Sequence, residues 1–374
     1  MIALLLIGVC LVLVGEFFLL RRYANKALSF WGADIKKTPV AIGKYIFIGL
    51  FILFSALFFS IFGIASIYAI AFWLMAELVY LIVRIFTKKR HVPLDFIVYS
   101  GILPFVFATV MMIYGFVNMH TVVMTEYTVH TDKTLDRDYT VAFLSDLHFG
   151  VSLDLDDLQE ICDEISANQP DVLLLGGDIV DESSPATQIE EMLRILGSVK
   201  TSYGVYYVYG NHDFPSRSIG TRDYTQAELE AWMASAGITV LTDETVNLGE
   251  HLTLIGRRDA SFKGTEGISE RAPIEKLCES VNKSKFIISL DHQPREYDLQ
   301  KRAGVDLIVS GHTHGGQIWP AGIFTTLIAP NEMDYGQRSE NGFSAIVSSG
   351  VAGWSFPVKT SKYAEYLIIT MTNK

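Results

Sequence analysis

The sequence predicts an α/β domain that follows an N-terminal membrane anchor. Two observations predict this division of the 374 residues. Residues 1–120 carry a net charge of +6 and contain long apolar runs, whereas residues 121–374 carry a net charge of −17. In the second part, short apolar runs typical of buried strands alternate with segments of helical periodicity. The overall composition, 50% hydrophobic residues with a net charge of −11, averages these two parts.

The composition excludes three classes of protein. A disordered chain contains fewer apolar residues, and a disulfide-rich secreted scaffold contains more than the three cysteines present here. Nucleic acid is not an expected partner, because a domain that binds it carries a surplus of Lys and Arg. The acidic part is long enough to bury a core of its own.

Four apolar segments form the predicted anchor, since about 20 helical residues cross a hydrocarbon core of about 30 Å. One long apolar run is divided near Gly63 into two antiparallel helices. No basic segment precedes the first helix, so a cleaved signal peptide is not expected, and Cys10 fits an apolar helix better than a lipoprotein signal. Glu77 has no second buried charge near it in the sequence and receives no function. The predicted transmembrane helices cover residues 1–20, 44–62, 65–86 and 94–117.

The loops between these helices predict the orientation of the chain. Basic residues gather in the first and third loops, and the positive-inside rule places such loops in the cytoplasm. Four spans then return the chain to the side on which it started. We therefore expect a multi-pass integral membrane protein whose domain after residue 120 is extracytoplasmic. The basic residues are Arg21, Arg22, Lys26, Lys36, Lys37 and Lys44 in the first loop, and Arg84, Lys88, Lys89 and Arg90 in the third.

Residues 121–138 are predicted to form a linker and a first strand, and residues 139–374 the main domain. Strands are expected to begin at residues 139, 171, 204, 238, 252, 286, 306, 343 and 364, and helices to cover 155–167, 189–199, 226–236 and 273–281. The last two strands alternate like an antiparallel pair. Cys162 and Cys278 fall on two of the helices, and free buried thiols fit their spacing better than a disulfide.

Polar residues able to bind metal ions follow the predicted strands. One such histidine is commonly a loop residue with ordinary hydrogen bonds, but that role does not explain five repetitions of the same placement. Loops at the carboxyl ends of strands are where α/β sheets form their sites. The residues in these loops are Asp146, His148, Asp178, Asn211, His212, His292, His312 and His314.

This set of side chains predicts two divalent metal ions. Ligands from His, Asp and Asn without a thiolate suit Mn²⁺, Fe or Zn²⁺ and disfavour a structural cysteine site. Asp146 and His148 are two residues apart, so an extended segment directs both to one side. Two ions about 3.5 to 4 Å apart need a bridging anion, which Asp178 can supply. Such a pair activates a hydroxide and holds both oxygens of an in-line displacement at phosphorus.

Five motifs in this order resemble the signature of the calcineurin-like metallophosphoesterases. They are SDLHFG, LGGDIVD, YGNHDF, LDHQP and SGHTHGGQ. The last motif is most similar to that of the membrane-anchored bacterial branch of the family. The resemblance implies a four-layer α/β fold, in which a two-sheet β-sandwich is flanked by helices.

The resemblance also implies a role for each motif residue. Asp178 would bridge the two ions. His212 would protonate the leaving oxygen or stabilise the phosphoryl charge, and Asp213 would orient it. The implied ligands are Asp146, His148, Asp178 and His314 for one ion, and Asp178, Asn211, His292 and His312 for the other.

Several neighbouring residues allow two interpretations each. Gly315 and Gly316 either form a phosphate-binding nest or are needed for a tight turn. Arg257 and Arg258 either clamp an anionic substrate or form salt bridges at the surface.

Asp181 and Asp291 flank motif residues. Each either orients a metal ligand or is a surface carboxylate.

We therefore predict a membrane-anchored two-metal phosphohydrolase that cleaves a phosphomonoester or phosphodiester. The linker of about nine residues reaches only about 30 Å, so the domain works beside the bilayer, and a lipid-linked or envelope phosphoester is the expected substrate. The alternative is a non-catalytic membrane receptor or interaction protein whose phosphoesterase-like domain binds metal for structure. The presence of His212 favours catalysis.

Overall fold

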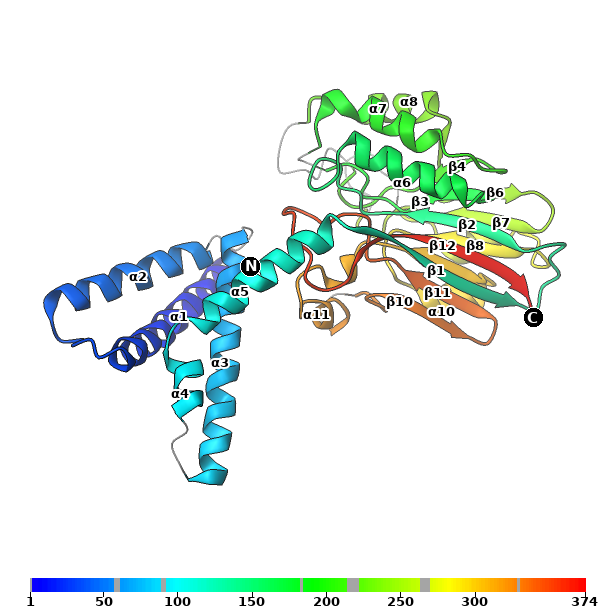
Figure 1. Ribbon diagram of the computed structural model, residues 1–374. Coiled ribbons are helices and arrows are strands. Elements are labelled where there is room, and N and C mark those ends of the chain that lie inside the picture. The colour runs from blue at the N-terminus through cyan, green and yellow to red at the C-terminus, as the bar shows by residue number, and fades with distance from the viewer. Residues whose placement is uncertain are drawn as a thin grey trace. The chain divides into compact units, whose positions relative to one another are not determined.

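The computed structural model describes residues 2–56, 61–88, 92–181, 184–213, 222–262, 270–327 and 330–374, with the side chains of all of these except 2–13, 54–56 and 92. The chain forms two compact units, Met1–Tyr114 and Gly115–Lys374. Figure 1 shows helices in the first unit and two sheets with flanking helices in the second.

The first unit is built from apolar helices. By length and composition, α3 can cross a membrane, and a second candidate is the pair Pro93–Tyr99 and Leu103–Met119, which is bent by 66°. The part of the chain that the structure describes therefore has one or two candidate spans, and a bundle of four is not shown. The helices are α1 (Ile2–Phe30), α2 (Thr38–Ala56), α3 (Ile61–Thr87), α4 (Val92–Tyr99) and α5 (Leu103–Met119), whose last turn belongs to the second unit.

The predicted boundaries in this unit need correction. Gly63 lies inside α3 and not at a turn. The expected fourth span is interrupted, because Gly101 has a left-handed φ of 81° and Pro104 cannot donate the backbone bond that would continue α4. The end of the second predicted span, the loop residues Lys89 and Arg90, and the side chains of most of the first span lie outside the described residues.

Glu77 has partners that its sequence neighbourhood does not reveal. Its carboxylate is buried and accepts from Arg22 at 2.6 Å and from Lys26 at 2.7 Å. Both cations lie on α1, which continues ten residues beyond the predicted first span. The Arg22 and Lys26 side chains are 51% and 33% exposed, so they are not buried charges, and another helix brings them to Glu77.

The second unit contains two mixed sheets with six strands each among the described residues. Sheet A has the order β1-β12-β2-β3-β4-β5 and sheet B the order β10-β11-β9-β8-β7-β6. Their strands are β1 (Val122–Thr131), β12 (Ala364–Asn373), β2 (Tyr139–Leu144), β3 (Val172–Leu175), β4 (Val205–Tyr207) and β5 (Ile238–Val240), then β10 (Gly336–Glu340), β11 (Phe343–Val347), β9 (Leu307–Ser310), β8 (Phe286–Leu290), β7 (Leu252–Gly256) and β6 (Glu244–Leu248).

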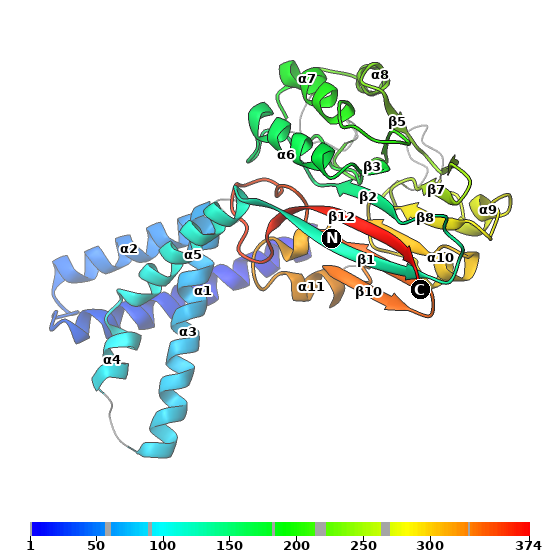
Figure 2. The same ribbon diagram turned by 45° about the vertical axis from the view of Figure 1, so that its right-hand side comes forward.

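Helices cover the outer faces of both sheets, so the unit has four layers (Figures 1 and 2). One apolar core joins sheet A to α6, α7 and α8, a second lies between the sheets, and a third joins sheet B to α9 and α10. This arrangement confirms the predicted two-sheet α/β architecture. The helices are α6 (Leu155–Ala167), α7 (Ala186–Gly197), α8 (Gln226–Ser235), α9 (Ile274–Cys278), α10 (Tyr297–Ala303) and α11 (Gly322–Leu327), with a short 3₁₀ turn η2 (His314–Gly316).

Local sequence accounts for several of these boundaries. Asp154 begins α6 with a capping box to Asp157, and Thr225 begins α8 with a capping box to Glu228. Gly304 ends α10 in the left-handed region, with φ 93°. Residues such as these explain why the predicted limits of α6 and α8 lie within one residue of the observed ones.

Three features of the second unit differ from the prediction. The last two predicted strands, β11 and β12, lie in different sheets, where β11 is parallel to β9 and β12 is antiparallel to β2. Strand β1 starts at Val122, so only two residues separate it from α5. Elements β10, α10 and α11 were not predicted, since short segments carry a weak periodic signal.

Cys162 and Cys278 are buried and free, as predicted.

Candidate metal centre

The predicted metal ligands meet where parallel strands of both sheets end. In sheet A, β2, β3 and β4 run parallel, and in sheet B, β8 and β9 run parallel, so their carboxyl ends form two edges of the sandwich. Each loop beyond these ends carries one of the sequence motifs. Segments that are as much as about 170 residues apart in the sequence thereby contribute side chains to one site.

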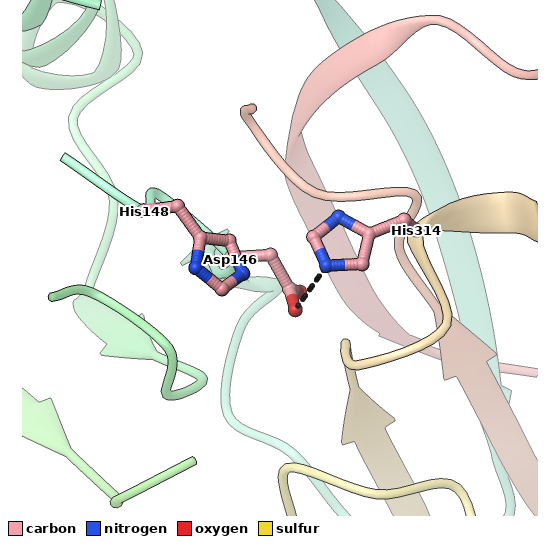
Figure 3. A group of neighbouring side chains, drawn as sticks. All are labelled: Asp146, His148 and His314. Atoms are coloured by element: carbon pink, nitrogen blue, oxygen red, sulfur yellow. Dashed lines mark ion pairs between the residues drawn. The ribbon is translucent and has the colours of Figure 1, made fainter. Parts of the chain in front are cut away.

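One group of possible metal ligands consists of Asp146, His148 and His314, which offer ligand atoms within 4.8 Å of one another. All three side chains are buried, and His314 Nε2 lies 3.6 Å from Asp146 Oδ1 (Figure 3). The rings of His148 and His314 are stacked with 5.1 Å between their centres.

A second group consists of Asp178, His292 and His312, again within 4.8 Å. Asn211 extends this group, since its Oδ1 lies 3.3 Å from His292 Nε2. These groups contain the side chains that the resemblance implies for each ion, with Asp178 in the second group; their binding of metal ions stays a prediction.

The Asp178 carboxylate faces both groups. Its Oδ2 lies 3.1 Å from His292 Nε2 and 3.9 Å from His148 Nε2. Its Oδ1 accepts a hydrogen bond of 2.7 Å from the backbone N–H of His212. One oxygen is thus directed to the space between the groups, as a bridging ligand requires, while the other holds the neighbouring loop.

Hydrogen bonds orient three of the imidazoles. The Nδ1 atoms of His148, His292 and His314 lie 3.0 Å from Asp181 Oδ2, 2.8 Å from the Gly176 carbonyl and 3.4 Å from the Ala352 carbonyl. In this arrangement each Nε2 is left to bind a metal ion. His148 Nε2 is buried and has no hydrogen-bond partner, which is costly for a polar nitrogen and fits a nitrogen that binds a metal ion.

Five of these residues have a backbone conformation that side chains rarely adopt. Their φ angles are positive, between 37° and 72°, although none is a glycine. Such strain costs of the order of 1 to 3 kcal/mol per residue and gathers at functional sites. The residues are Asp146, His148, Asp178, His312 and His314.

The charges of the site favour ionised carboxylates. Burial by itself would raise the pKa of Asp178, but the neighbouring His292 and His148 hold that pKa well below its ordinary value. Burial lowers the pKa of His312 to about 4 and that of His314 to about 3. These two imidazoles are therefore neutral at pH 7, which is the form that binds metal ions.

Asp213 holds the backbone around Asp178. Its buried carboxylate accepts hydrogen bonds from the backbone N–H groups of Asp178 at 2.7 Å, Ile179 at 2.9 Å, Val180 at 3.1 Å and Gly210 at 2.6 Å. These bonds place Asp178 between the two groups.

His212 lies beside the first group. Its ring centre is 5.3 Å from that of His148 and 5.2 Å from that of Trp354. Arg222 donates to the carbonyl oxygens of His212 and Asp213, and it thereby fixes the loop that carries both.

The structure brings the two predicted arginines to carboxylates of the protein itself. Arg257 is buried, lies 3.4 Å from Glu296 and 3.7 Å from Asp243, and donates to the Ala272 carbonyl. Arg258 Nε lies 3.5 Å from Asp243. These contacts match the salt-bridge interpretation, although the pair around Arg257 is buried and not at the surface.

The other open interpretations are resolved in part. Asp181 and Asp291 are both buried, so neither is a surface carboxylate. Asp181 contacts His148, whereas Asp291 pairs with Arg271.

Gly315 and Gly316 have φ angles of 55° and 72°, which a tight turn requires.

Lys359 belongs to the structure of the site, yet no sequence pattern indicates it. Its buried amine donates to the carbonyls of Ser349, Gly350 and Ala352, the last of which also contacts His314. It holds the segment behind His314 from a position 45 residues further along the chain. A lone lysine in a polar loop carries no periodic or motif signal that would have identified this role.

Two groups of possible metal ligands lie at the ends of parallel strands on a two-sheet α/β fold. Residues 139–316 match the family model described as calcineurin-like phosphoesterase. Residues 139–316 therefore form a calcineurin-like phosphoesterase domain within the second unit.

Relatives of known sequence agree with this assignment. An uncharacterised metallophosphoesterase of Helicobacter pylori is 31% identical over 63% of this chain and 60% of its own length. A transmembrane protein with a metallophosphoesterase domain from Danio rerio is 27% identical over 72% of this chain and 62% of its own length. The relatives include bacterial and animal proteins, so they do not specify the predicted bacterial branch. This chain spans about 60% of the length of these relatives.

Solved structures show lower similarity. A dimetal phosphatase from Danio rerio is 11% identical, with a TM-score of 0.40 over 57% of this chain and 87% of the other.

Proposed function

We propose that this chain is a membrane-anchored two-metal phosphohydrolase that cleaves a phosphomonoester or phosphodiester. The observation that carries the proposal is the Asp178 carboxylate, whose Oδ2 faces His292 on one side and His148 on the other. A neutral imidazole cannot bridge two cations in this way, whereas a carboxylate can. The family and the possible metal-binding residues both support a phosphoesterase.

The donor set fits two divalent ions. One would be held by Asp146, His148, Asp178 and His314, and the other by Asp178, Asn211, His292 and His312. When bound, such ions lower the pKa of water and withdraw charge from phosphoryl oxygens. Mn²⁺, Fe and Zn²⁺ all suit these nitrogen and oxygen ligands.

His212 is the proposed proton donor to the leaving oxygen. Its loop is held by the hydrogen bond from its backbone N–H to Asp178 and by Arg222 on the other side. An imidazole carries an N–H that can donate a proton, which suits a general acid. Asp213 bonds to backbone N–H groups around Asp178, so we assign it a positioning role.

The substrate is proposed to be lipid-linked or an envelope phosphoester. The support is the short connection of two residues between α5 and β1, which keeps the domain close to any membrane that α5 enters. We also propose that this domain is extracytoplasmic, because the positive-inside rule places the basic loops of the helical unit in the cytoplasm. Relatives named as transmembrane proteins and the one or two candidate spans suggest membrane association.

Hydrolysis by the full-length protein in detergent tests the proposed activity. The assay uses Mn²⁺ with p-nitrophenyl phosphate and with bis(p-nitrophenyl) phosphate, and bound metal is measured by elemental analysis. We expect turnover of at least one ester and its loss after chelation. Two bound ions without turnover of either ester would contradict the proposal and support a non-catalytic metal-binding domain.

A fusion after Lys374 tests the orientation. Alkaline phosphatase in this position is expected to be active and green fluorescent protein to be dark. Bright cytoplasmic fluorescence would contradict an extracytoplasmic domain.

A further inference from the structure

Exposed apolar side chains of the second unit gather in one region. Among its described residues, nine large apolar side chains are exposed, and seven of them lie on three segments, 115–119, 319–327 and 354–363. We call these seven the apolar rim. They are Phe116 and Val117, then Trp319, Ile323, Phe324 and Leu327, and Tyr363. The remaining two are Met124 on β1 and Leu299 on α10.

Hydrogen bonds join the three segments. Asn118, at the end of α5, donates to the carbonyls of Lys359 and Lys362 at 2.8 Å each. The Lys359 N–H donates to the Gly115 carbonyl at 2.9 Å. From the other side, the Trp319 N–H donates to Thr360 at 3.1 Å. The apolar rim is therefore one structural unit and not a set of separate exposed residues.

Helix α11 differs from the other helices of the unit. α6 buries four and α7 five side chains against sheet A, whereas α11 buries none. Ile323, Phe324 and Leu327 are 58%, 52% and 74% exposed. Exposed apolar side chains that gather on neighbouring segments are uncommon on a protein that is surrounded by water, and such groups mark interaction sites.

The apolar rim lies close to the candidate metal centre. Helix α11 follows the ligand His314 after seven residues, and Gly316 is packed so closely against Gly322 that a Cβ atom at residue 316 would collide with it. Strand β1 is parallel to β12, and β12 is antiparallel to β2. The start of β1 is therefore at the edge of the sheet where β2 delivers Asp146, and Figures 1 and 2 show α11 at this same end.

The strand register shows how far the start of β1 lies from the candidate metal centre. Val122 pairs with Ala364, and continuing the pairing of Leu367 with Phe143 places Ala364 opposite Asp146. The first residue of β1 is thus two strands from a metal ligand, or about 10 Å. The apolar helix α5 ends three residues earlier, at Met119.

We propose that the apolar rim inserts into the surface of the lipid bilayer and brings the metal centre to phosphoesters at the bilayer surface. The bilayer is the occupant we infer because α5, which supplies Phe116 and Val117, continues from the apolar rim as an apolar candidate membrane segment. Trp and Tyr side chains, here Trp319 and Tyr363, suit the interface between lipid and water. Attraction by anionic lipid cannot replace apolar insertion, since residues 121–374 carry a charge of −17.

The inference deepens the proposed function and rests on it for the reaction, but its test does not depend on turnover. Spin labels are attached to Leu327→Cys and, as the matched control, to Leu299→Cys in the full chain in vesicles of neutral phosphatidylcholine. Labelled wild-type protein gives the background from the native cysteines. We expect the label at position 327 at about 5 to 10 Å below the lipid phosphates, where apolar faces of interfacial helices lie, and the label at position 299 in water.

Three results would overturn the inference. The first is that the label at position 327 is as accessible to a water-soluble relaxation agent as the label at position 299. The second is that the label at position 327 shows spin coupling to a second copy of the chain and no contact with lipid. The third is that Phe324→Ser with Leu327→Ser leaves the depth of a label at Ile323→Cys unchanged. If instead depth is as expected but no ester is hydrolysed, the membrane surface stands and the proposed activity fails.

Discussion

The two units of this chain use similar apolar side chains in opposite ways. Among the described residues, 27 large apolar side chains are exposed in the first unit and nine in the second. In the second unit, strands β3, β7, β8, β9 and β11 are buried at every position. Helices α2, α3 and α5 are apolar around much of their circumference, which is typical of segments surrounded by lipid.

This difference shows that hydropathy and burial have to be distinguished. The second unit buries its apolar residues against other residues of the protein, and the site forms where those strands end. The first unit leaves many of its apolar side chains exposed, and its one or two candidate spans suggest a membrane around them. We therefore expect the chemistry to depend on the second unit and the environment of the chain to depend on the first.

Asp178→Asn is expected to have the largest effect. The neutral amide cannot neutralise two cations, so hydrolysis of p-nitrophenyl phosphate should fall by about three orders of magnitude or more. Circular dichroism should show an unchanged fold, and elemental analysis should show loss of at least one ion. Glu77→Gln, which removes a carboxylate of the first unit, is the control and should retain turnover. Unchanged rates for Asp178→Asn would mean that the bridge lies elsewhere.

His212→Ala tests proton donation while the proposed metal ligands stay unchanged. Loss of a general acid is expected to lower turnover by about 10² to 10⁴. Bound metal should remain at the wild-type level, because the variant keeps the backbone N–H that bonds to Asp178. A leaving group as good as p-nitrophenolate should show a smaller loss than an alkyl phosphate. Equal losses for both esters would argue against proton donation.

A pair of leucine substitutions tests the contrast in packing. Leu254 is fully buried between the sheets, so Leu254→Ala should cost about 2 to 5 kcal/mol of unfolding free energy. Leu78 on α3 is 59% exposed, and Leu78→Ala should cost less than about 1 kcal/mol. Thermal unfolding of the full chain in detergent measures both. A large loss from Leu78→Ala would show that another surface covers α3 tightly.

Lys359 is expected to have a smaller effect, which concerns how the free energy of unfolding depends on pH. Burial lowers its pKa from 10.5 to about 7, so between these values the unfolded chain binds a proton that the folded chain does not. Unfolding free energy should therefore rise with pH across this window, by at most about 1.4 kcal/mol per pH unit from this group. Lys359→Met should remove that rise in urea titrations of the metal-free protein. An unchanged pH profile would show that the amine is not titrating there.

The candidate metal ligands were predictable because they lie in loops that follow buried strands. Asp146, Asp178 and His292 are close in space because β2, β3 and β8 deliver their carboxyl ends to one region. Placement of a polar residue at a strand end is a local property, so the spacing of the motifs reveals it. The capped helices were predictable for the same reason.

Other features depended on contacts that have no local signal. Arg257 is held by Asp243 and Glu296, and Glu77 by two cations of α1, through pairs that are distant in sequence. The break at Gly101 follows from a left-handed backbone that a hydropathy profile does not show.

The sequence by itself determined the division into an apolar basic part and an acidic α/β part, the family, and the set of possible ligands. Only the tertiary structure decided how Asp178 faces both ligand groups, which nitrogen each oriented imidazole leaves for a metal ion, and where α11 exposes its apolar side chains. The physical reason is that composition and periodicity report the preference of each segment for water or apolar surroundings. The direction of a buried side chain depends on partners that folding brings from other strands and helices.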